Sequence, residues 1–346
     1  MASIQLDGLS FRYPGAEEYT LAPLSLNVAD GTAFALLGAS GAGKTTLLNL
    51  LSGLLAPTSG RIFFGDDDVS YVAGRQRNVA QVFQFPVLYE SLSVAENLAF
   101  PLRARKFDPL WIDERVRHIA ADLAITEQLP FVAADLSLFQ KQLVAIGRAL
   151  VRPDVSVVLL DEPLTAVEPR MKWRLRQTLR RVQEELAVTM IYVTHDQTEA
   201  LTFADQVAVM ADGGLLQVGT PEQIYATPSC EFVGYFIGSP GMNFVDIERL
   251  ESSLEVSVGA SRVGFRPEWV LLKPQGQGQL AGTVESIQLA GTESGAATGV
   301  VRLDTAAGRV AVRGKLNVAV GDHVGIELRQ HLCFSAQGDL VTAEYD

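Results

Sequence analysis

The 346-residue chain has few cysteines, few basic residues and no long apolar run. Its two cysteines, Cys230 and Cys333, lie far apart and form no C-x-x-C pair, which predicts reduced thiols in a cytosolic protein. The net charge of −12 argues against a nucleic-acid partner, because such partners need a basic surface. No segment approaches the ~20 apolar residues of a membrane span, and the first residues carry no export-type signal. The length predicts about two domains.

The most informative segment spans residues 38–45 and reads Gly-Ala-Ser-Gly-Ala-Gly-Lys-Thr, a complete G-x-x-x-x-G-K-T phosphate-binding loop. An apolar run at 33–37 precedes it and a helix-like run at 46–51 follows, which is the context that the motif requires. An accidental Gly-rich turn is the alternative, and this context disfavours it. Backbone N–H groups are expected to surround the phosphates, with Lys44 at the β- and γ-phosphates and Thr45 on Mg²⁺. The residues predicted to bind nucleotide here are Gly38, Ser40, Gly41, Gly43, Lys44, Thr45 and Thr46.

Three further segments carry side chains suited to chemistry on a triphosphate. An apolar strand at 156–160 ends in Asp161 and Glu162. Asp161 is placed to bind Mg²⁺ and Glu162 to polarise the attacking water. His195 follows the next apolar strand, where it can bind the γ-phosphate and the water, although a lone histidine is more often structural. Gln84 lies in a loop where its amide can contact Mg²⁺, and by itself it would be a surface glutamine.

The sequence pattern predicts two domains that differ in secondary structure. Residues 1–235 alternate apolar strands with helix-forming stretches, which is typical of an α/β fold with a parallel sheet buried on both faces. Residues 236–346 show short alternating strands, which are typical of a small antiparallel barrel or sandwich. Gly238 begins the expected hinge. The expected strands are 4–13, 24–28, 156–160, 189–194, 282–289, 299–303, 309–313 and 324–328, with a hairpin at 208–217 and a charged outer helix at 171–186.

The segment at 135–150, Asp-Leu-Ser-Leu-Phe-Gln-Lys-Gln-Leu-Val-Ala-Ile-Gly-Arg-Ala-Leu, gives the clearest family resemblance. In order with Gln84, the Asp-Glu-Pro run at 161–163 and His195, it resembles the ATPase subunits of ABC transporters, most closely the carbohydrate-uptake importers of the maltose and glycerol-phosphate type. The resemblance covers the whole chain, because that subgroup also carries a small C-terminal regulatory barrel. Residues 238–244 and 264–268 look like the entry motifs of that barrel, and a binding role for nucleic acid is the alternative that the acidic composition disfavours.

The resemblance implies a RecA-like core with a helical subdomain at about 86–152, followed by an OB-like (TOBE-type) all-β regulatory domain. It implies hydrolysis of ATP with Mg²⁺ at the cytoplasmic face of the inner membrane, as a peripheral subunit. The implied partners are a second ATPase subunit, two transmembrane permease subunits and, indirectly, an extracytoplasmic solute-binding protein. Tyr13 matches the aromatic residue that stacks on adenine, with core packing as the alternative. The apolar run at 85–89 matches a groove for a permease helix, and a core role is again the alternative.

The chain departs from the family at the surface that it offers to a second ATPase subunit. In the family each ATP lies between the P-loop of one chain and the signature of the other, normally Leu-Ser-Gly-Gly-Gln. Ser137 and Gln140 remain and are expected to act in trans, whereas Leu138 and Phe139 replace both glycines and are expected to crowd the phosphate. The loop at 165–168, Thr-Ala-Val-Glu, departs from the family's Ser-Asn-Leu-Asp.

These departures affect the surface offered to the partner, while the chain's own nucleotide-binding residues are intact. The resulting hypothesis is a heterodimer with a similar subunit whose signature is intact, in preference to a homodimer. A soluble ABC-type ATPase of repair or translation and a non-hydrolytic regulatory paralogue are the alternative functions. The solute is left open among sugars, polyols, glycerol and glycerol-phosphate.

Overall fold

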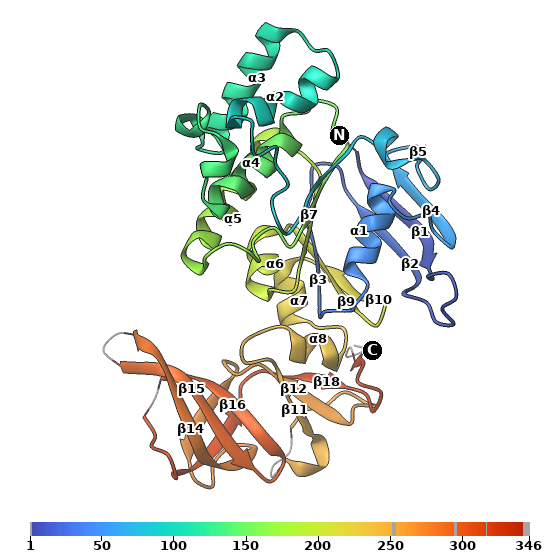
Figure 1. Cartoon of the computed structure of the whole chain (residues 1–346). Coiled ribbons are helices and arrows are strands. Elements are labelled where there is room, and N and C mark those ends of the chain that lie inside the picture. The colour runs from blue at the N-terminus through green and yellow to red at the C-terminus, as the bar shows by residue number, and fades with distance from the viewer. Residues whose placement is uncertain (1, 251–253, 294–295, 316, 342–346) are drawn as a thin grey trace. The chain divides into compact units, whose positions relative to one another are not determined.

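The computed structural model describes residues 2–250, 254–293, 296–315 and 317–341. They fold into two compact units, Met1–Pro221 and Glu222–Asp346 (Figure 1). This boundary lies before residue 236, where the sequence pattern changes from alternating strands and helices to short strands. The intervening helices α7 (Pro221–Ala226) and α8 (Glu231–Phe236) are tied to the second unit by Arg266, which donates to the carbonyls of Tyr225 (2.6 Å) and Gly234 (2.9 Å).

A six-stranded sheet forms the centre of the first unit. Its order is β10-β9-β3-β8-β7-β6, and all neighbouring pairs are parallel except β10 with β9. The predicted hairpin is therefore confirmed as β9–β10, and the predicted buried strands as β3, β7 and β8. The strands are β3 (Ala33–Gly38), β6 (Val79–Val82), β7 (Val157–Asp161), β8 (Met190–Thr194), β9 (Gln206–Ala211) and β10 (Gly214–Gly219).

A second, antiparallel sheet of four strands, in the order β2-β1-β4-β5, also belongs to this unit. Helix α1 (Lys44–Ser52) packs with both sheets, because its leucines share one apolar cluster with residues of β1, β2, β3 and β8. The strands are β1 (Ile4–Phe11), β2 (Leu21–Val28), β4 (Ser59–Phe64) and β5 (Asp67–Asp68).

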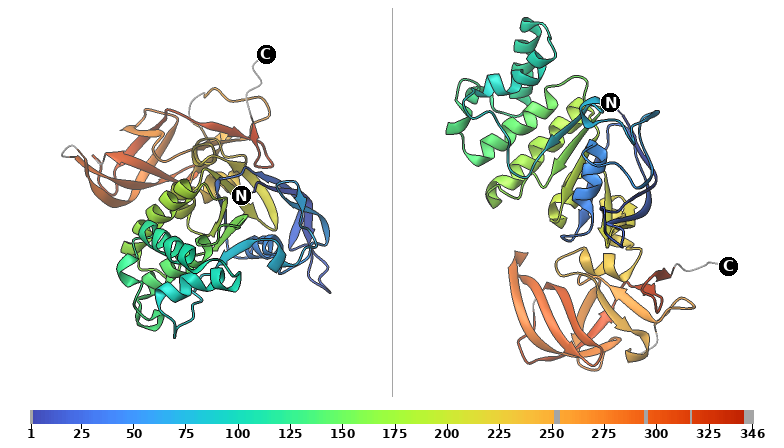
Figure 2. Two further views of the ribbon diagram at one scale, coloured as in Figure 1. Left: turned by 90° about the horizontal axis from the view of Figure 1, so that it is seen from above. Right: turned by 45° about the vertical axis from the view of Figure 1, so that its right-hand side comes forward.

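The other helices of this unit pack on the opposite face of the six-stranded sheet. In Figure 2, α2 and α3 (teal) lie on the far side of that sheet from β1 and β2 (dark blue). Ser93 and Ser137 begin α2 and α4 with reciprocal capping boxes, which satisfy backbone groups that a helix start leaves free. The helices are α2 (Val94–Ala104), α3 (Pro109–Asp122), α4 (Leu138–Leu150), α5 (Pro169–Leu186) and α6 (Gln197–Phe203), with 3₁₀ turns η1 (Gly74–Gln76), η2 (Thr126–Gln128) and η3 (Ala133–Asp135).

Alternate residues of the central strands enter different cores. In β7, Val158 and Leu160 pack with the helices α2–α5, whereas Val157 and Leu159 pack with α1 and the antiparallel sheet. Successive side chains of a strand point to opposite faces, so a strand covered on both sides must be apolar throughout. This burial explains the unbroken apolar runs in the sequence.

The second unit confirms the predicted all-β region. After α8, its described residues form a four-stranded sheet, β11-β12-β18-β19, and a five-stranded sheet, β13-β17-β14-β15-β16, both antiparallel. The five-stranded sheet curls, because its edge strands β13 and β16 come into contact. The elements are β11 (Asn243–Asp246), η4 (Ile247–Arg249), β12 (Arg262–Phe265), β13 (Val270–Pro274), β14 (Leu280–Glu293), β15 (Ala296–Thr305), β16 (Gly308–Lys315), β17 (His323–Leu328), β18 (Leu332–Phe334) and β19 (Leu340–Val341).

No helix within the described ranges has the length and apolarity needed to cross a membrane.

Candidate nucleotide-binding site

The predicted phosphate-binding loop connects β3 to α1 and has the backbone that its glycines allow. Gly41 and Gly43 have φ values of 85° and 93°, in the left-handed region that side chains disfavour. A Cβ atom at Gly43 would lie 2.6 Å from Leu21 Cδ2, whereas one at Gly41 would have no neighbour within 4 Å. Helix α1 begins at Lys44, so the free N–H groups of its first turn adjoin the loop. The loop therefore combines an open surface with backbone donors at a helix start, as phosphate binding requires.

Lys44 folds back over the loop that precedes it. Its Nζ donates to the carbonyl oxygens of Gly38 and Ala39, both at 2.8 Å, and the residue is buried. Burial lowers the pKa of Lys44, while the nearby charges of Glu162 and Asp161 act in the opposite direction. Backbone oxygens thus hold the ammonium group at the loop, where it also feels the negative charges at the end of β7.

The strand register brings the predicted catalytic residues to one edge of the sheet. Leu37 of β3 pairs with Thr194 of β8, and Val193 of β8 pairs with Asp161 of β7. Because these strands are parallel, the residues that follow them lie at the same carboxyl edge. That edge carries the phosphate-binding loop, Asp161, Glu162 and His195. Burial raises the pKa of Asp161, as does the Glu162 charge, and Lys44 partly offsets both.

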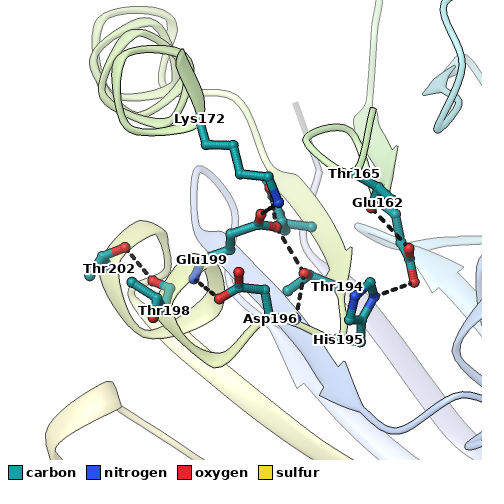
Figure 3. A network of polar contacts seen from close by, with 10 residues as sticks. Glu162, Thr165, Lys172, Thr194, His195, Asp196, Thr198, Glu199 and Thr202 are labelled. Atoms are coloured by element: carbon teal, nitrogen blue, oxygen red, sulfur yellow. Dashed lines mark hydrogen bonds and ion pairs between the residues drawn. The ribbon is translucent and has the colours of Figure 1, made fainter. Parts of the chain in front are cut away.

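Glu162 is held from two sides (Figure 3). Its Oε1 lies 3.0 Å from His195 Nδ1, and its Oε2 accepts a hydrogen bond of 3.1 Å from Thr165 Oγ1. The backbone has φ 45°, and its N–H donates to the Val193 carbonyl at 2.9 Å. Positive φ at a non-glycine residue is uncommon and is often found at functional sites. The structure therefore places Glu162 and His195 in direct contact.

A buried acidic residue that the sequence pattern did not reveal lies behind His195. Glu199 is only 2% exposed, and its Oε2 accepts hydrogen bonds from Tyr192 Oη (3.0 Å) and Thr194 Oγ1 (2.9 Å). Its Oε1 lies 3.1 Å from Lys172 Nζ. Burial and the charge of Glu199 raise the pKa of Tyr192, which therefore stays protonated and donates. The available signal was the alternation of hydroxyl groups along β8, which places both on one face.

Tyr13 lies on the loop between β1 and β2, and Gln84 lies on the loop that follows β6. Tyr13 is 44% exposed and meets Phe11 edge-on, with ring centroids 4.8 Å apart. The end of the β1–β2 loop reaches the phosphate-binding loop, since a Cβ at Gly43 would lie 3.1 Å from the Thr20 carbonyl oxygen. Gln84 is half-buried just beyond β6, the strand next to β7. Tyr13 is therefore not buried in the core, and stacking of its exposed ring on adenine stays a prediction.

The residues predicted to act in trans form the start of α4. Ser137 caps the helix, with its Oγ accepting from Gln140 N–H at 3.3 Å, and Gln140 Oε1 accepts from Ser137 N–H at 3.0 Å. Leu138 is 42% exposed, whereas Phe139 is half-buried and packs against the core of α2–α5. The two residues that replace the family glycines thus point differently, and only Leu138 is exposed at the helix start.

The donor set fits a magnesium nucleotide better than a metal bound by protein alone. Within the ranges that the structure describes, no group of three or more His, Cys, Asp or Glu side chains could hold a metal. The predicted set is the Thr45 hydroxyl, the Asp161 carboxylate and the Gln84 amide, all of which offer oxygen. Mg²⁺ prefers oxygen ligands and is usually held by one or two carboxylates together with substrate phosphates.

A phosphate-binding loop at the start of a helix, with two carboxylates and a histidine at the same sheet edge, defines a P-loop ATPase. The comparisons with known proteins agree. Residues 21–165 match the ABC transporter family model. The chain is 36% identical over 311 residues to the sn-glycerol-3-phosphate import ATP-binding protein UgpC of Chromobacterium violaceum, covering 85% of this chain and 84% of the relative.

Two further relatives extend this result. The trehalose/maltose import ATP-binding protein MalK of Thermococcus litoralis is 44% identical over 251 residues, covering 71% of this chain and 67% of the relative. The solved structure of cbiO1 from Clostridium perfringens, part of the ABC transporter complex cbiONQ, is 30% identical with a TM-score of 0.61, covering 65% of this chain and 90% of that one. The chain therefore belongs to the ABC transporter family, as an ATP-binding and ATP-hydrolysing protein, which confirms the predicted resemblance.

Proposed function

We propose that this ATPase powers the import of a small polar solute through separate membrane permease subunits, at the cytoplasmic face of the membrane. The observation that carries the proposal is the convergence of Lys44, Asp161, Glu162 and His195 at one sheet edge beside the phosphate-binding loop. The solute class follows from the relatives, which are named for import of glycerol-3-phosphate and of trehalose and maltose.

The residues of the nucleotide-binding site have different roles in ATP hydrolysis. Backbone N–H groups of the loop and the Lys44 ammonium bind the phosphates, and Tyr13 stacks on the base. Glu162 accepts the proton of the attacking water, and His195 hydrogen-bonds the water and the γ-phosphate. Thr45, Asp161 and Gln84 would hold Mg²⁺, which neutralises charge on the phosphate oxygens when bound.

A groove with exposed aromatic side chains and two arginines supports the permease proposal. Its cavity of ≈ 300 Å³ is lined by β6, by the loop that follows it and by the C-terminal halves of α2 and α4. Tyr89, at its wall, contacts Phe100 with the ring planes tilted by 42° and the centroids 4.4 Å apart, and it lies under the Arg148 guanidinium at 5.5 Å. Exposed apolar patches of this kind mark protein–protein contacts, and a short permease helix is the occupant that we propose. The lining includes Val79, Val82, Phe83, Val87, Tyr89, Phe100, Ala145 and Arg148.

We further propose that the chain pairs with a similar ATPase subunit that carries an intact Gly-Gly signature. The exposed Leu138 side chain supports this proposal, because backbone must approach phosphate closely at this helix start. In such a pair, the site on this chain's P-loop would receive an intact signature. The site on the partner's P-loop would receive Leu138 and would turn over slowly, since losing one aimed donor costs ~10²–10³ in rate.

The test is co-purification of a tagged chain from its native membranes, followed by measurement of ATP hydrolysis. We expect two permease subunits and a second ATPase subunit in the assembly, and loss of hydrolysis in Glu162→Gln. Purification without any permease would favour a soluble ABC-type ATPase. Unchanged hydrolysis by the Glu162→Gln assembly would instead show that the chain is a non-hydrolytic paralogue or that another residue is the base.

A further inference from the structure

An ion pair between the half-buried Lys172 and the buried Glu199 joins two elements that are separate in sequence. Lys172 lies in the first turn of α5, and Glu199 lies in α6, just after the turn that carries His195. A carboxylate buried to 2% exposure is stable only when charged or polar partners compensate it. Glu199 has Lys172 on one oxygen and the hydroxyl groups of Tyr192 and Thr194 on the other.

The segments that lead into these two helices are the ones that contact Glu162. Figure 3 shows that His195 approaches one oxygen of Glu162 from the end of β8, while Thr165 approaches the other. Thr165 belongs to the loop that leads directly into α5, and Lys172 extends from α5 back to Glu199. The contacts therefore form a closed ring: Glu162 to His195, along the turn to Glu199, across to Lys172, and along α5 to Thr165.

We propose that the Lys172–Glu199 pair is a positioning device for the catalytic carboxylate. It fixes the separation between the His195 turn and the 165–168 loop, and this separation sets the position of Glu162 between them. The inference rests on the proposed role of Glu162 as the base. Small displacements of catalytic groups are costly, because a shift of about 1 Å can lower the rate by ~10².

The test compares Lys172→Met with wild type in the full-length chain, within the assembly purified from its native membranes. We expect kcat to fall about tenfold with KM for ATP changed less than about twofold, because the groups proposed to bind ATP lie on other elements. Lys172→Arg keeps the charge and is expected to restore kcat to within about threefold of wild type. The matched control is Lys273→Met, which removes a lysine–glutamate pair of 2.9 Å in the second unit and is expected to leave kcat unchanged.

A double variant covers the case in which an unpaired buried Glu199 prevents folding. Lys172→Met with Glu199→Gln removes both charges and keeps an amide oxygen for Tyr192 and Thr194, so it leaves no lone buried charge. The same loss of kcat is expected. The NMR signal of His195 gives a readout that general destabilisation does not change. The His195→Gln variant identifies this signal among those of the four histidines. The signal should shift in the double variant and stay in place in Lys273→Met.

The outcomes separate this inference from the proposed function. Wild-type kcat in Lys172→Met and in the double variant, together with an inactive Glu162→Gln assembly, would overturn the positioning role alone. An active Glu162→Gln assembly would overturn the role of Glu162 and the inference with it. A rise in KM equal to the fall in kcat/KM would also overturn the positioning role, since it would show loss of ATP binding.

Discussion

The two residues that replace the signature glycines at the start of α4 have different surroundings. The substitution of both signature glycines was visible in the sequence, and crowding by both side chains was the natural expectation. The structure places Leu138 in solvent and packs Phe139 against the core of α2–α5. The direction of a side chain at a helix start depends on the tertiary neighbours, which a motif does not report. The two positions therefore differ in their expected effects.

Glycine substitutions made separately at the two positions should have different effects, one on ATP turnover and the other on stability. Leu138→Gly removes the exposed side chain, and we expect faster ATP turnover with a stability change within about 1 kcal/mol. Phe139→Gly removes a half-buried ring and should lower the free energy of unfolding by about 2 kcal/mol. Turnover by the assembly and chemical denaturation of the isolated chain measure the two effects. Unchanged turnover in Leu138→Gly would contradict the proposed crowding.

A methyl group at Gly43 should weaken nucleotide binding at least about tenfold. The φ of 93° and the 2.6 Å approach to Leu21 Cδ2 both oppose a side chain, so the loop must change shape in Gly43→Ala. Equilibrium binding of a fluorescent ATP analogue measures the loss. The control is Gly65→Ala, which has φ 59° and open space around it, and it should bind normally.

At the scale of elements, the long apolar runs were the most predictable part of the chain. The runs that became β3, β7 and β8 are buried on both faces, so their sequence alone identifies them as strands. The short strands β6 and β12 were not predicted. Each is only four residues long, and its conformation depends on pairing with neighbouring strands. The site edge was predictable because its residues follow strands. The Lys172–Glu199 contact was not, since it depends on how α5 packs beside α6.

A buried arginine just after β12 joins α7 and α8 to this strand. Arg266 is 0% exposed, lies 4.1 Å from the Tyr225 ring centroid and donates to the backbone carbonyls of both helical segments. Burial lowers the pKa of this guanidinium, so it bears a desolvation cost that these acceptors offset. Arg266→Met would leave buried carbonyls without donors and should destabilise the second unit by about 3 kcal/mol.

Amide hydrogen exchange in β12 measures this loss of stability. Arg309→Met serves as the control, because it removes an exposed arginine pair with Glu285 at 2.7 Å and should change stability by less than ~1 kcal/mol. Equal exchange in both variants would show that Arg266 does not hold this region together.

At the scale of the whole molecule, the chain consists of two units with separate apolar cores. Every residue proposed to bind ATP or Mg²⁺ lies in Met1–Pro221. A ligand that binds only the folded state stabilises the part that it contacts, by ≈ 2.7 kcal/mol at a concentration of 100 Kd. Bound nucleotide should therefore stabilise the first unit and leave the stability of the second unit unchanged.

We expect a non-hydrolysable ATP analogue with Mg²⁺ to slow amide exchange in α1, β3 and β7 of the isolated chain and to leave β14–β17 unchanged. Removal of Mg²⁺ with EDTA should reduce this protection, because the predicted ligands Thr45 and Asp161 would then lose their shared ion. Mass spectrometry of peptides from both units measures the difference. Comparable slowing in β14–β17 would contradict a ligand site confined to the first unit.

The place of Phe139 has a consequence for how this protein can evolve. Its half-buried ring packs against the helical core, so a change to glycine removes contacts that no other side chain replaces. A change to glycine at Leu138 keeps this packing. Of the two single steps toward a glycine-containing helix start, the one at position 138 therefore costs less stability and is more accessible to mutation and selection.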